Sequence, residues 1–252
     1  MSLPAFSLET WVLIGAVYFL AGCVKGVVGL GLPSVAVGLG TVVVGMKPAL
    51  ALLIVPSFVT NVWQAVVGNA FGAIVRRTWL MLATIFLGTW GGAWLLARLD
   101  AAVLGTVLGA TLMGYAMMGF TRPELPHPGR FERVLQVPVG LLHGLIAGMT
   151  GSFIPGVPFL QALGLTKDVL VQGMGILFTA STIAMALAMA DQRLLSAELA
   201  VASAAVVVPA LLGMVVGQRL RAGLSEARFK QLLFGALGLL GGYILWRAQL
   251  SR

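Results

Sequence analysis

The chain has 252 residues, of which 59% are hydrophobic and 10% are charged, and its formal net charge is +8. A soluble domain of this length needs far more polar surface, and the apolar runs are continuous rather than alternating, which excludes a membrane β-barrel. The basic residues form no basic face and no aromatic–basic motif, so we expect no nucleic-acid partner. We therefore predict an all-α polytopic membrane protein in contact with the lipid bilayer.

Apolar segments follow one another along the chain and are separated by Gly, Pro or charged residues. In the first half they lie at 11–30, 33–46, 48–70, 78–97 and 101–120. In the second half they lie at 134–151, 155–165, 168–190, 195–218 and 227–247. The short second segment of each half is either a thin crossing or part of a re-entrant hairpin, which leaves roughly 8–10 transmembrane segments.

The two halves match each other, which indicates an internal duplication. Gly22, Gly26, Gly29 and Pro33 recur as Gly144, Gly148, Gly151 and Pro155 at one constant offset, and Lys47 aligns with Lys167. Further along, Gly92 and Arg98-Leu99 correspond to Gly213 and Arg219-Leu220. We predict a first transmembrane repeat at 1–120, a cytoplasmic linker at 121–133 and a second transmembrane repeat at 134–252.

The number of crossings in each half decides how the two repeats are oriented. Whether the short segment crosses or returns, each half has an odd number of net crossings, so the second repeat is inverted relative to the first. With 71–77 in the cytoplasm, ten cations fall inside and five outside, as the positive-inside rule requires. The inside set is Arg76, Arg77, Arg122, Arg130, Arg133, Lys167, Arg219, Arg221, Arg228 and Lys230, and the outside set is Lys47, Arg98, Arg193, Arg247 and Arg252. An even number of crossings would split these charges almost evenly, so we predict inverted repeats with both termini outside the cytoplasm.

The stretch "GCVKGVVGLGLP" at 22–33 places small residues and a helix break inside an apolar run. Glycines on one helix face let neighbouring helices approach closely, and packing alone would explain them. Gly31 and Pro33 add a break, because proline lacks an N–H and glycine bends easily. The freed backbone groups must be buried in protein or face water, and a helix that restarts there offers N–H groups suited to anions. Inverted repeats would bring two such breaks together near the middle of the membrane.

Lys25 lies on the glycine stripe of this stretch. An intramembrane lysine costs at least ~2.5–3.5 kcal/mol, so it needs a partner or a purpose. All eight acidic residues fall at or near predicted loops, which suggests that the missing negative charge is that of a substrate. The alternative is that Lys25 extends along its helix to a lipid headgroup.

Other polar residues lie beside the two breaks and can donate hydrogen bonds to anion oxygens, although each could equally bond to a neighbouring helix. We predict a substrate-binding set of Lys25, Gly29, Gly31, Thr60, Asn61, Thr150, Gly151, Ser152, Phe153 and Ser181. We assign candidate gating or coupling roles to Pro33, Gln64, His143, Pro155, Gln172 and Thr179. No metal site and no cofactor are expected, and the sequence leaves the coupling ion, a proton or sodium, open.

With these residues the chain resembles the sulfite exporter TauE/SafE family, also called the toluene-sulfonate uptake permease family. That family carries a Gly-rich signature early in each of two repeats, here "GCVKGVVGLGLP" and "GLIAGMTGSFIPGVP" (144–158). Its usual triple-glycine core is reduced to Gly29-Leu30-Gly31 and Gly151-Ser152-Phe153 in this chain. The resemblance implies transport of sulfite, organosulfonates or related oxyanions, commonly outward, in the bacterial inner membrane.

The leading hypothesis is a secondary transporter of a small oxoanion that rocks one repeat against the other. An anion channel, a carrier of another small organic anion and a scaffold protein remain alternatives. An intramembrane enzyme is not expected, because His143 and Ser152 are nine residues apart on one segment, too far to hydrogen-bond within a helix.

Overall fold

The computed structural model describes residues 6–121, 125–221 and 226–250. Two cations of the predicted charge distribution, Arg122 and Arg252, lie outside the described residues. The helices of the first half are α1 (Leu8–Val28), α2 (Leu32–Val44), α3 (Met46–Val66), α4 (Phe71–Arg98) and α5 (Ala101–Thr121). A 3₁₀ turn, η1 (Gly129–Phe131), then precedes α6 (Glu132–Thr150), α7 (Val157–Ala162), α8 (Lys167–Asp191), α9 (Ala197–Ala205), α10 (Val207–Arg221) and α11 (Glu226–Leu250).

The described residues are helical and contain no strand, which confirms the predicted fold class. Seven helical stretches among them are long and apolar enough to cross a membrane: Leu8–Val28, Met46–Val66, Phe71–Arg98, Ala101–Thr121, Lys167–Asp191, Ala197–Leu220 and Leu233–Leu250. α2 and α7 are short, and α6 carries Gln136, Pro138 and His143 within its length. The protein is therefore a multi-pass helical membrane protein.

The predicted segment 195–218 forms two consecutive helices instead of one. Pro209 has no N–H to donate to the carbonyl of Ala205, and its ring crowds that carbonyl. α9 ends at Ala205 for this reason, while Val206 and Ala210 still donate to the carbonyls four residues earlier and keep the two helices continuous.

A second proline, Pro56, lies inside α3 and leaves the carbonyl of Leu52 without its usual donor. The hydroxyl of Ser203 on α9 donates to that carbonyl over 2.8 Å. The same hydroxyl accepts a hydrogen bond from the N–H of Val55 over 3.0 Å. One side chain therefore satisfies the backbone groups that the proline disturbs.

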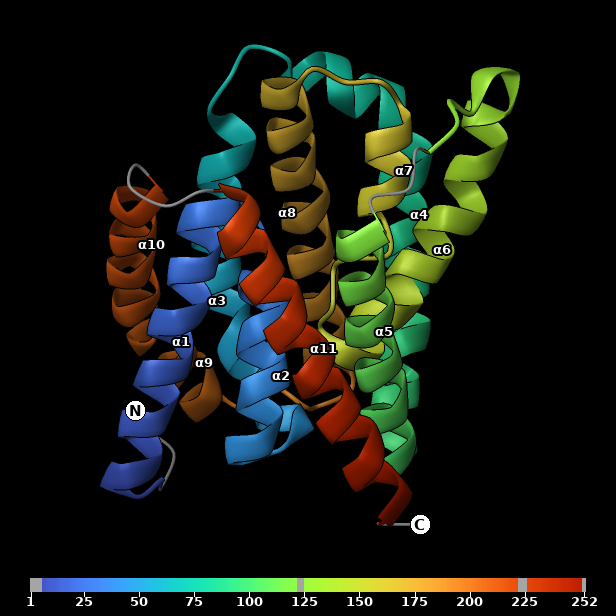
Figure 1. The fold of residues 1–252 in the computed structure, drawn as a ribbon. Helices are drawn as coiled ribbons and strands as arrows, with labels where there is room; N and C mark the ends of the chain where they lie inside the picture. The colour runs from blue at the N-terminus through green and yellow to red at the C-terminus, as the bar shows by residue number, and fades with distance from the viewer. Residues whose placement is uncertain (1–5, 122–124, 222–225, 251–252) are drawn as a thin grey trace. The chain divides into compact units, whose positions relative to one another are not determined.

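The chain divides into two compact units, and each takes helices from both halves of the sequence. Unit 1 comprises Met1–Pro56, Leu99–Pro123 and Leu195–Arg252, and unit 2 comprises Ser57–Arg98 and Glu124–Leu194. In unit 1, α1 packs along α10 and α5 packs along α11 (Figure 1). In unit 2, α4 packs against α6 and α8.

The α1–α10 and α4–α6 pairs make equivalent contacts. A Cβ on Gly22 would overlap the carbonyl oxygen of Ala210, and a Cβ on Gly144 would overlap that of Ile85. Gly26 and Gly148 repeat the relationship one turn further, against the carbonyls of Met214 and Thr89. Only glycine allows backbones this close, so the glycine match that indicates a duplication is also a match of packing geometry.

The contacts correct one part of the repeat alignment. Gly213 faces the carbonyl of Phe19, and Gly88 faces that of Leu141, the position equivalent to Phe19. Gly213 is therefore the counterpart of Gly88 rather than of Gly92, one helical turn from the predicted match. The shared Arg-Leu pairs suggested the wrong register, because they lie beyond the glycines that form the contact.

The last helices of the two halves, α5 and α11, run antiparallel within unit 1. Gly109 lies against Gly241 and Leu245, whereas Gly119 lies against the ring of Phe234, so residue numbers rise on one helix as they fall on the other. Counterpart helices in parallel repeats would run the same way. The antiparallel pair is therefore compatible with the predicted inverted repeats.

Candidate functional site

The first helix break lies between α1 and α2, in unit 1. Gly29 and Gly31 adopt left-handed backbone conformations, with φ of 83° and 103°, which residues with a Cβ rarely adopt. The N–H of Gly29 donates to the carbonyl of Lys25 over 2.7 Å and closes the last turn of α1. α2 restarts at Leu32 with Pro33 in its first turn, where the missing N–H is not needed. No side chain among the described residues caps this N-terminus, so first-turn N–H groups lack helical partners.

Lys25 lies in the last turn of α1, four residues before the glycine that ends the helix. Its side chain is only 4% exposed. The neighbouring Gly22 and Gly26 hold α1 against the backbone of α10, so this face of the helix is turned toward protein. Such burial argues against the alternative that the amine reaches a lipid headgroup.

The second break follows α6, in unit 2, and repeats the left-handed glycine that ends the helix before the first break. Gly151 has a left-handed φ of 66°, and its N–H donates to the carbonyl of Ala147 over 2.7 Å. Residues 152–154 are not helical, and α7 then runs for only 6 residues. α7 is too short to carry a substantial helix dipole, so the N-terminal argument of the sequence applies to α2 and not to α7.

Hydrogen-bond donors without acceptors collect at the second break. The hydroxyl of Ser152 is buried and has no partner among the described residues. The backbone N–H groups of Phe153 and Ile154 likewise donate to no described residue, and both residues are buried. Thr150 is satisfied locally, because its hydroxyl donates to the carbonyl of Ile146 and accepts from the N–H of Ser152. Buried donors without acceptors are rare, so this short segment is suited to an acceptor-rich ligand.

His143 on α6 ties the second break to α8. Its Nδ1 accepts a hydrogen bond from the N–H of Gly156 over 2.9 Å. Its Nε2 lies 2.8 Å from the hydroxyl of Ser181, which itself donates to the carbonyl of Leu177. All of these groups are buried. Ser181, predicted as a substrate ligand, is therefore occupied by protein partners.

Gln64 and Gln172 form a clasp between α3 and α8 in unit 2. Gln64 Nε2 donates to the carbonyl of Val171 over 2.9 Å, and Gln172 Nε2 donates to that of Ala65 over the same distance. Gln172 Oε1 also accepts from the N–H of Ala70 in the turn before α4. Both donors of this clasp bind backbone carbonyls, which describes a structural fastening of two helices.

The remaining predicted polar residues lie on α3 and α8. Thr60 and Asn61 are fully buried on α3, and the hydroxyl of Thr60 donates to the carbonyl of Ser57 over 3.3 Å. Thr179 donates to the carbonyl of Gly175 in its own helix over 2.7 Å. The predicted set is divided between the units: Lys25, Gly29, Gly31 and Pro33 belong to unit 1, and the others belong to unit 2.

Three buried hydroxyls escaped the sequence prediction. Tyr18, Ser57 and Thr89 each have a hydroxyl with no partner among the described residues. Thr89 lies on α4, where its backbone meets Gly144 and Gly148 of α6. Ser and Thr hydroxyls in helices usually bond to their own backbone, so Ser57 and Thr89 in apolar spans gave no signal. The only available cue was that Tyr18 lies seven residues, two turns, before Lys25 on the same face.

The two breaks follow the same backbone turn at a left-handed glycine and differ in chemistry. Lys25 corresponds to Ala147, since each accepts from the left-handed glycine four residues later. Ser152 corresponds to Leu30, and His143 corresponds to Ala21. The first break therefore carries the cation, whereas the second carries the neutral donors and the histidine.

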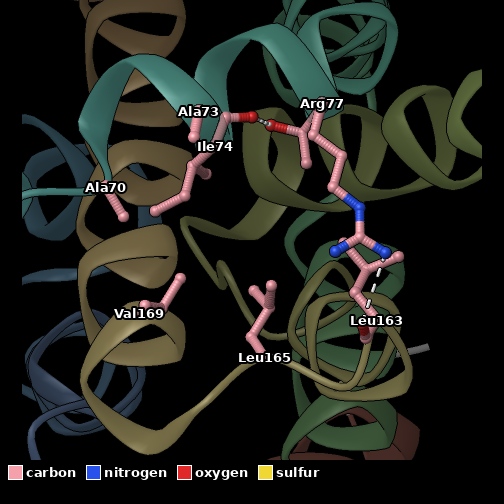
Figure 2. Close-up of a pocket in the computed structure, with 8 residues that line it drawn as sticks. Ala70, Ala73, Ile74, Arg77, Leu163, Leu165 and Val169 are labelled. Atoms are coloured by element: carbon pink, nitrogen blue, oxygen red, sulfur yellow. Dashed lines mark hydrogen bonds between the residues drawn. The ribbon is translucent and has the colours of Figure 1, made fainter.

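A cavity of about 110 Å³ lies elsewhere in unit 2, between the start of α4 and the segment joining α7 to α8. Its lining is mostly apolar and includes none of the predicted site residues: Ala70, Ala73, Ile74, Arg77, Thr78, Leu163, Leu165 and Val169. Figure 2 shows the Arg77 guanidinium directed to the carbonyl of Leu163. Arg77 also binds both carboxylate oxygens of Glu132, over 2.7 and 2.8 Å. Its charge is already paired, so this cavity is not suited to a small anion.

A comparison with known protein families gives a match that spans both glycine-rich breaks. The family model for sulfite exporter TauE/SafE proteins covers residues 14–244, nearly the whole chain and both breaks. The chain belongs to the sulfite exporter TauE/SafE family. No curated protein and no solved structure matches it. Membership of the TauE/SafE family confirms the predicted resemblance and makes the protein a membrane transporter of sulfite or related sulfur anions.

Proposed function

We propose that the protein exports sulfite or a small organosulfonate across the bacterial inner membrane by alternating access, and that each helix break, within its own unit, offers groups suited to binding an anion. One observation carries the proposal. Two breaks that follow equivalent helix ends differ in chemistry, because one has a buried ammonium in the preceding turn and the other has buried donors without acceptors.

Lys25 supplies the positive charge in this proposal. A sulfonate or sulfite group carries its charge on oxygens that only accept hydrogen bonds, and an ammonium group has three donors and no acceptor. The first-turn N–H groups of α2 add partial positive charge without adding a titratable group. Within a low-dielectric protein interior, this combination favours an anion strongly.

The second break supplies orientation. The Ser152 hydroxyl and the N–H groups of Phe153 and Ile154 are consecutive along the chain, and backbone donors in irregular segments commonly bind anions. These neutral donors discriminate by geometry rather than by charge. We therefore assign Ser152 to substrate selection and Lys25 to affinity.

The moving bodies in alternating access are the compact units, not the two halves of the sequence. Rocking one half against the other would separate α1 from α10 and α6 from α4, whose backbones touch at glycines. The α1–α10 and α4–α6 contacts stay intact when each unit moves as a rigid body, because both helices of each pair belong to the same unit. Pro56, where the border between the units crosses α3, is a natural point for the helix to bend.

We place both termini outside the cytoplasm and the 121–133 linker inside, from the distribution of Lys and Arg. Acidic residues of the described spanning helices lie in their end turns, as Glu9, Asp168, Asp191 and Glu198 do. A relay of carboxylates through the membrane is therefore not part of the proposal. A coupled proton would cross as part of the substrate, as bisulfite.

Flux into proteoliposomes tests the proposal. Purified protein is reconstituted, and uptake of radiolabelled sulfite is compared with that of methanesulfonate, sulfate and chloride, with and without a pH gradient. We expect saturable sulfite or sulfonate flux that protein-free liposomes lack. Absence of flux for every sulfur anion contradicts the proposed substrate class, and large unitary currents in planar bilayers would identify a channel instead.

A further inference from the structure

His143 is placed where it can control the shape of the second break. The residue lies on α6, eight positions before the left-handed Gly151, and its side chain is fully buried. Its ring contacts the break at two points. Nδ1 accepts from the N–H of Gly156 over 2.9 Å, and the Phe153 ring lies with its centroid 6.3 Å from that of the imidazole.

These contacts determine which nitrogen carries the proton. A backbone N–H can only donate, so Nδ1 must be unprotonated where it accepts from Gly156. The neutral ring then carries its proton on Nε2 and donates it to the Ser181 hydroxyl, 2.8 Å away. The Ser181 hydroxyl in turn donates a hydrogen bond to the carbonyl of Leu177. Each donor in this series therefore has an acceptor.

Gly156 is the residue that permits this arrangement. A Cβ there would lie 2.9 Å from Nδ1 of His143, 2.9 Å from a methyl group of Leu177 and 2.8 Å from that of Met81. Its φ of −84° is ordinary, so a side chain there would be opposed by crowding against the His143 ring and not by backbone strain. The equivalent of His143 in the first break is Ala21, so the fastening exists only at the second break.

We propose that His143 is a positioning residue: it fastens the segment 151–156 to α8 so that Ser152, Phe153 and Ile154 present their donors to the anion. The inference rests on the proposed function. In this proposal His143 and Ser181 do not bind the substrate. Together they hold the segment 151–156 against α8. Loss of the fastening loosens the donors and weakens substrate binding, while the transport cycle itself continues.

Two measurements on the full-length protein test this role. In proteoliposomes we expect His143→Ala to raise the KM for sulfite about tenfold with a maximal rate within twofold of wild type. His143→Asn offers a side-chain oxygen close to the position of Nδ1, and we expect it to return the KM to within threefold. Ser181→Ala should raise the KM in the same direction. Thr182→Ala is the matched control, because its equally buried hydroxyl bonds only to Phe178 in its own helix.

Hydrogen–deuterium exchange without substrate tests the fastening independently of transport. We expect faster exchange in peptides covering 151–157 in His143→Ala and Ser181→Ala, and wild-type exchange in Thr182→Ala.

Two results overturn the inference. One is unchanged exchange in both His143→Ala and Ser181→Ala, and the other is a maximal rate that falls while the KM stays constant. If His143→Ala does not purify, His143→Asn and Ser181→Ala decide, since a wild-type KM in Ser181→Ala also overturns it. Failure of the wild type to carry sulfite contradicts the proposed function and leaves the exchange result to judge the fastening.

Discussion

Lys25 and Ala147 occupy equivalent positions, because each carbonyl accepts a 2.7 Å hydrogen bond from a left-handed glycine that ends its helix. The duplicated scaffold thus repeats a backbone turn and changes the side chain beside it. In the proposed function, the first break contributes a charge and the second contributes hydroxyl and amide donors, a division that an exact repeat would not supply.

Ser152→Ala tests the neutral half of this division. The substitution removes a buried hydroxyl that has no partner among the described residues, so it breaks no protein hydrogen bond. We expect unchanged or slightly higher thermal stability, since burial of an unsatisfied polar group is unfavourable. We also expect roughly a five- to tenfold rise in the KM for sulfite, as for the loss of one hydrogen bond of about 1–1.4 kcal/mol. A clear fall in melting temperature with an unaltered KM would show that Ser152 is structural.

The glycine contacts lead to a second prediction. Gly22→Ala and Gly144→Ala each place a methyl group against a backbone carbonyl of the partner helix, and we expect a destabilisation of about 1–3 kcal/mol for each. Gly15→Ala, on the same helix as Gly22, meets no atom within 4 Å and is the matched control. Melting temperatures of the purified variants in detergent measure the effect. Equal melting temperatures for Gly22→Ala and Gly15→Ala would mean that α1 and α10 are not in backbone contact.

The sequence predicted where the helices lie but not which helices pack against these glycines. Apolar runs and Gly-Pro breaks located the helices, because a membrane span needs about 20 apolar residues. Two segments differed: Pro209 divides α9 from α10 within 195–218, and α4 begins at Phe71 rather than at 78. The glycine stripe revealed a packing face but not its partner, since Gly22 in the first half meets Ala210 in the second. The pairing is a property of tertiary packing that local patterns do not encode.

At the candidate site, the helix breaks could be predicted from the sequence, but the side-chain contacts could not. The helix breaks were predicted from the glycines and prolines of the two repeats, whereas the left-handed turns at Gly29 and Gly151 come from the structure. The bond from Gly156 to His143 did not, because it joins two segments through a nitrogen whose orientation only the fold decides. Ser181 was assigned to substrate for the same reason, and the structure gives it two protein partners.

The ion pair at the start of α6 gives a pH-dependent prediction. The Arg77 guanidinium hydrogen-bonds to Glu132 and holds the pKa of that carboxyl below its ordinary value. A carboxyl whose pKa is lower in the folded state stabilises the protein above its unfolded-state pKa of about 4.3. That stabilisation is lost as the pH falls through the folded-state value.

We therefore expect Glu132→Gln to lower stability at pH 7 by no more than about 1 kcal/mol, as for a partly exposed pair. The difference from wild type should shrink as the pH falls below the unfolded-state pKa and vanish below the lower folded-state pKa. Melting curves of both proteins across this pH range provide the measurement. A difference that persists undiminished in acid would attribute the effect to packing of the side chain.

Ser203→Ala probes the proline in α3. Without the hydroxyl, the carbonyl of Leu52 loses its donor and the N–H of Val55 loses its acceptor. Two unsatisfied backbone groups in a buried segment predict a loss of about 2–4 kcal/mol. Ser203→Thr keeps the hydroxyl and should retain most of the stability. Melting temperatures that agree between Ser203→Ala and wild type would assign those backbone groups other partners.

Sulfite flux through Lys25→Ala proteoliposomes is the most direct measurement, with Lys47→Ala, an exposed lysine at the start of α3, as the control. Anion binding at the first break predicts that Lys25→Ala reduces flux at least about 100-fold, since a buried charge-assisted contact of ~3 kcal/mol is lost. Lys47→Ala should retain wild-type flux, and both variants should purify as folded protein. Wild-type sulfite flux in a folded Lys25→Ala protein would contradict the assignment of this lysine to the anion.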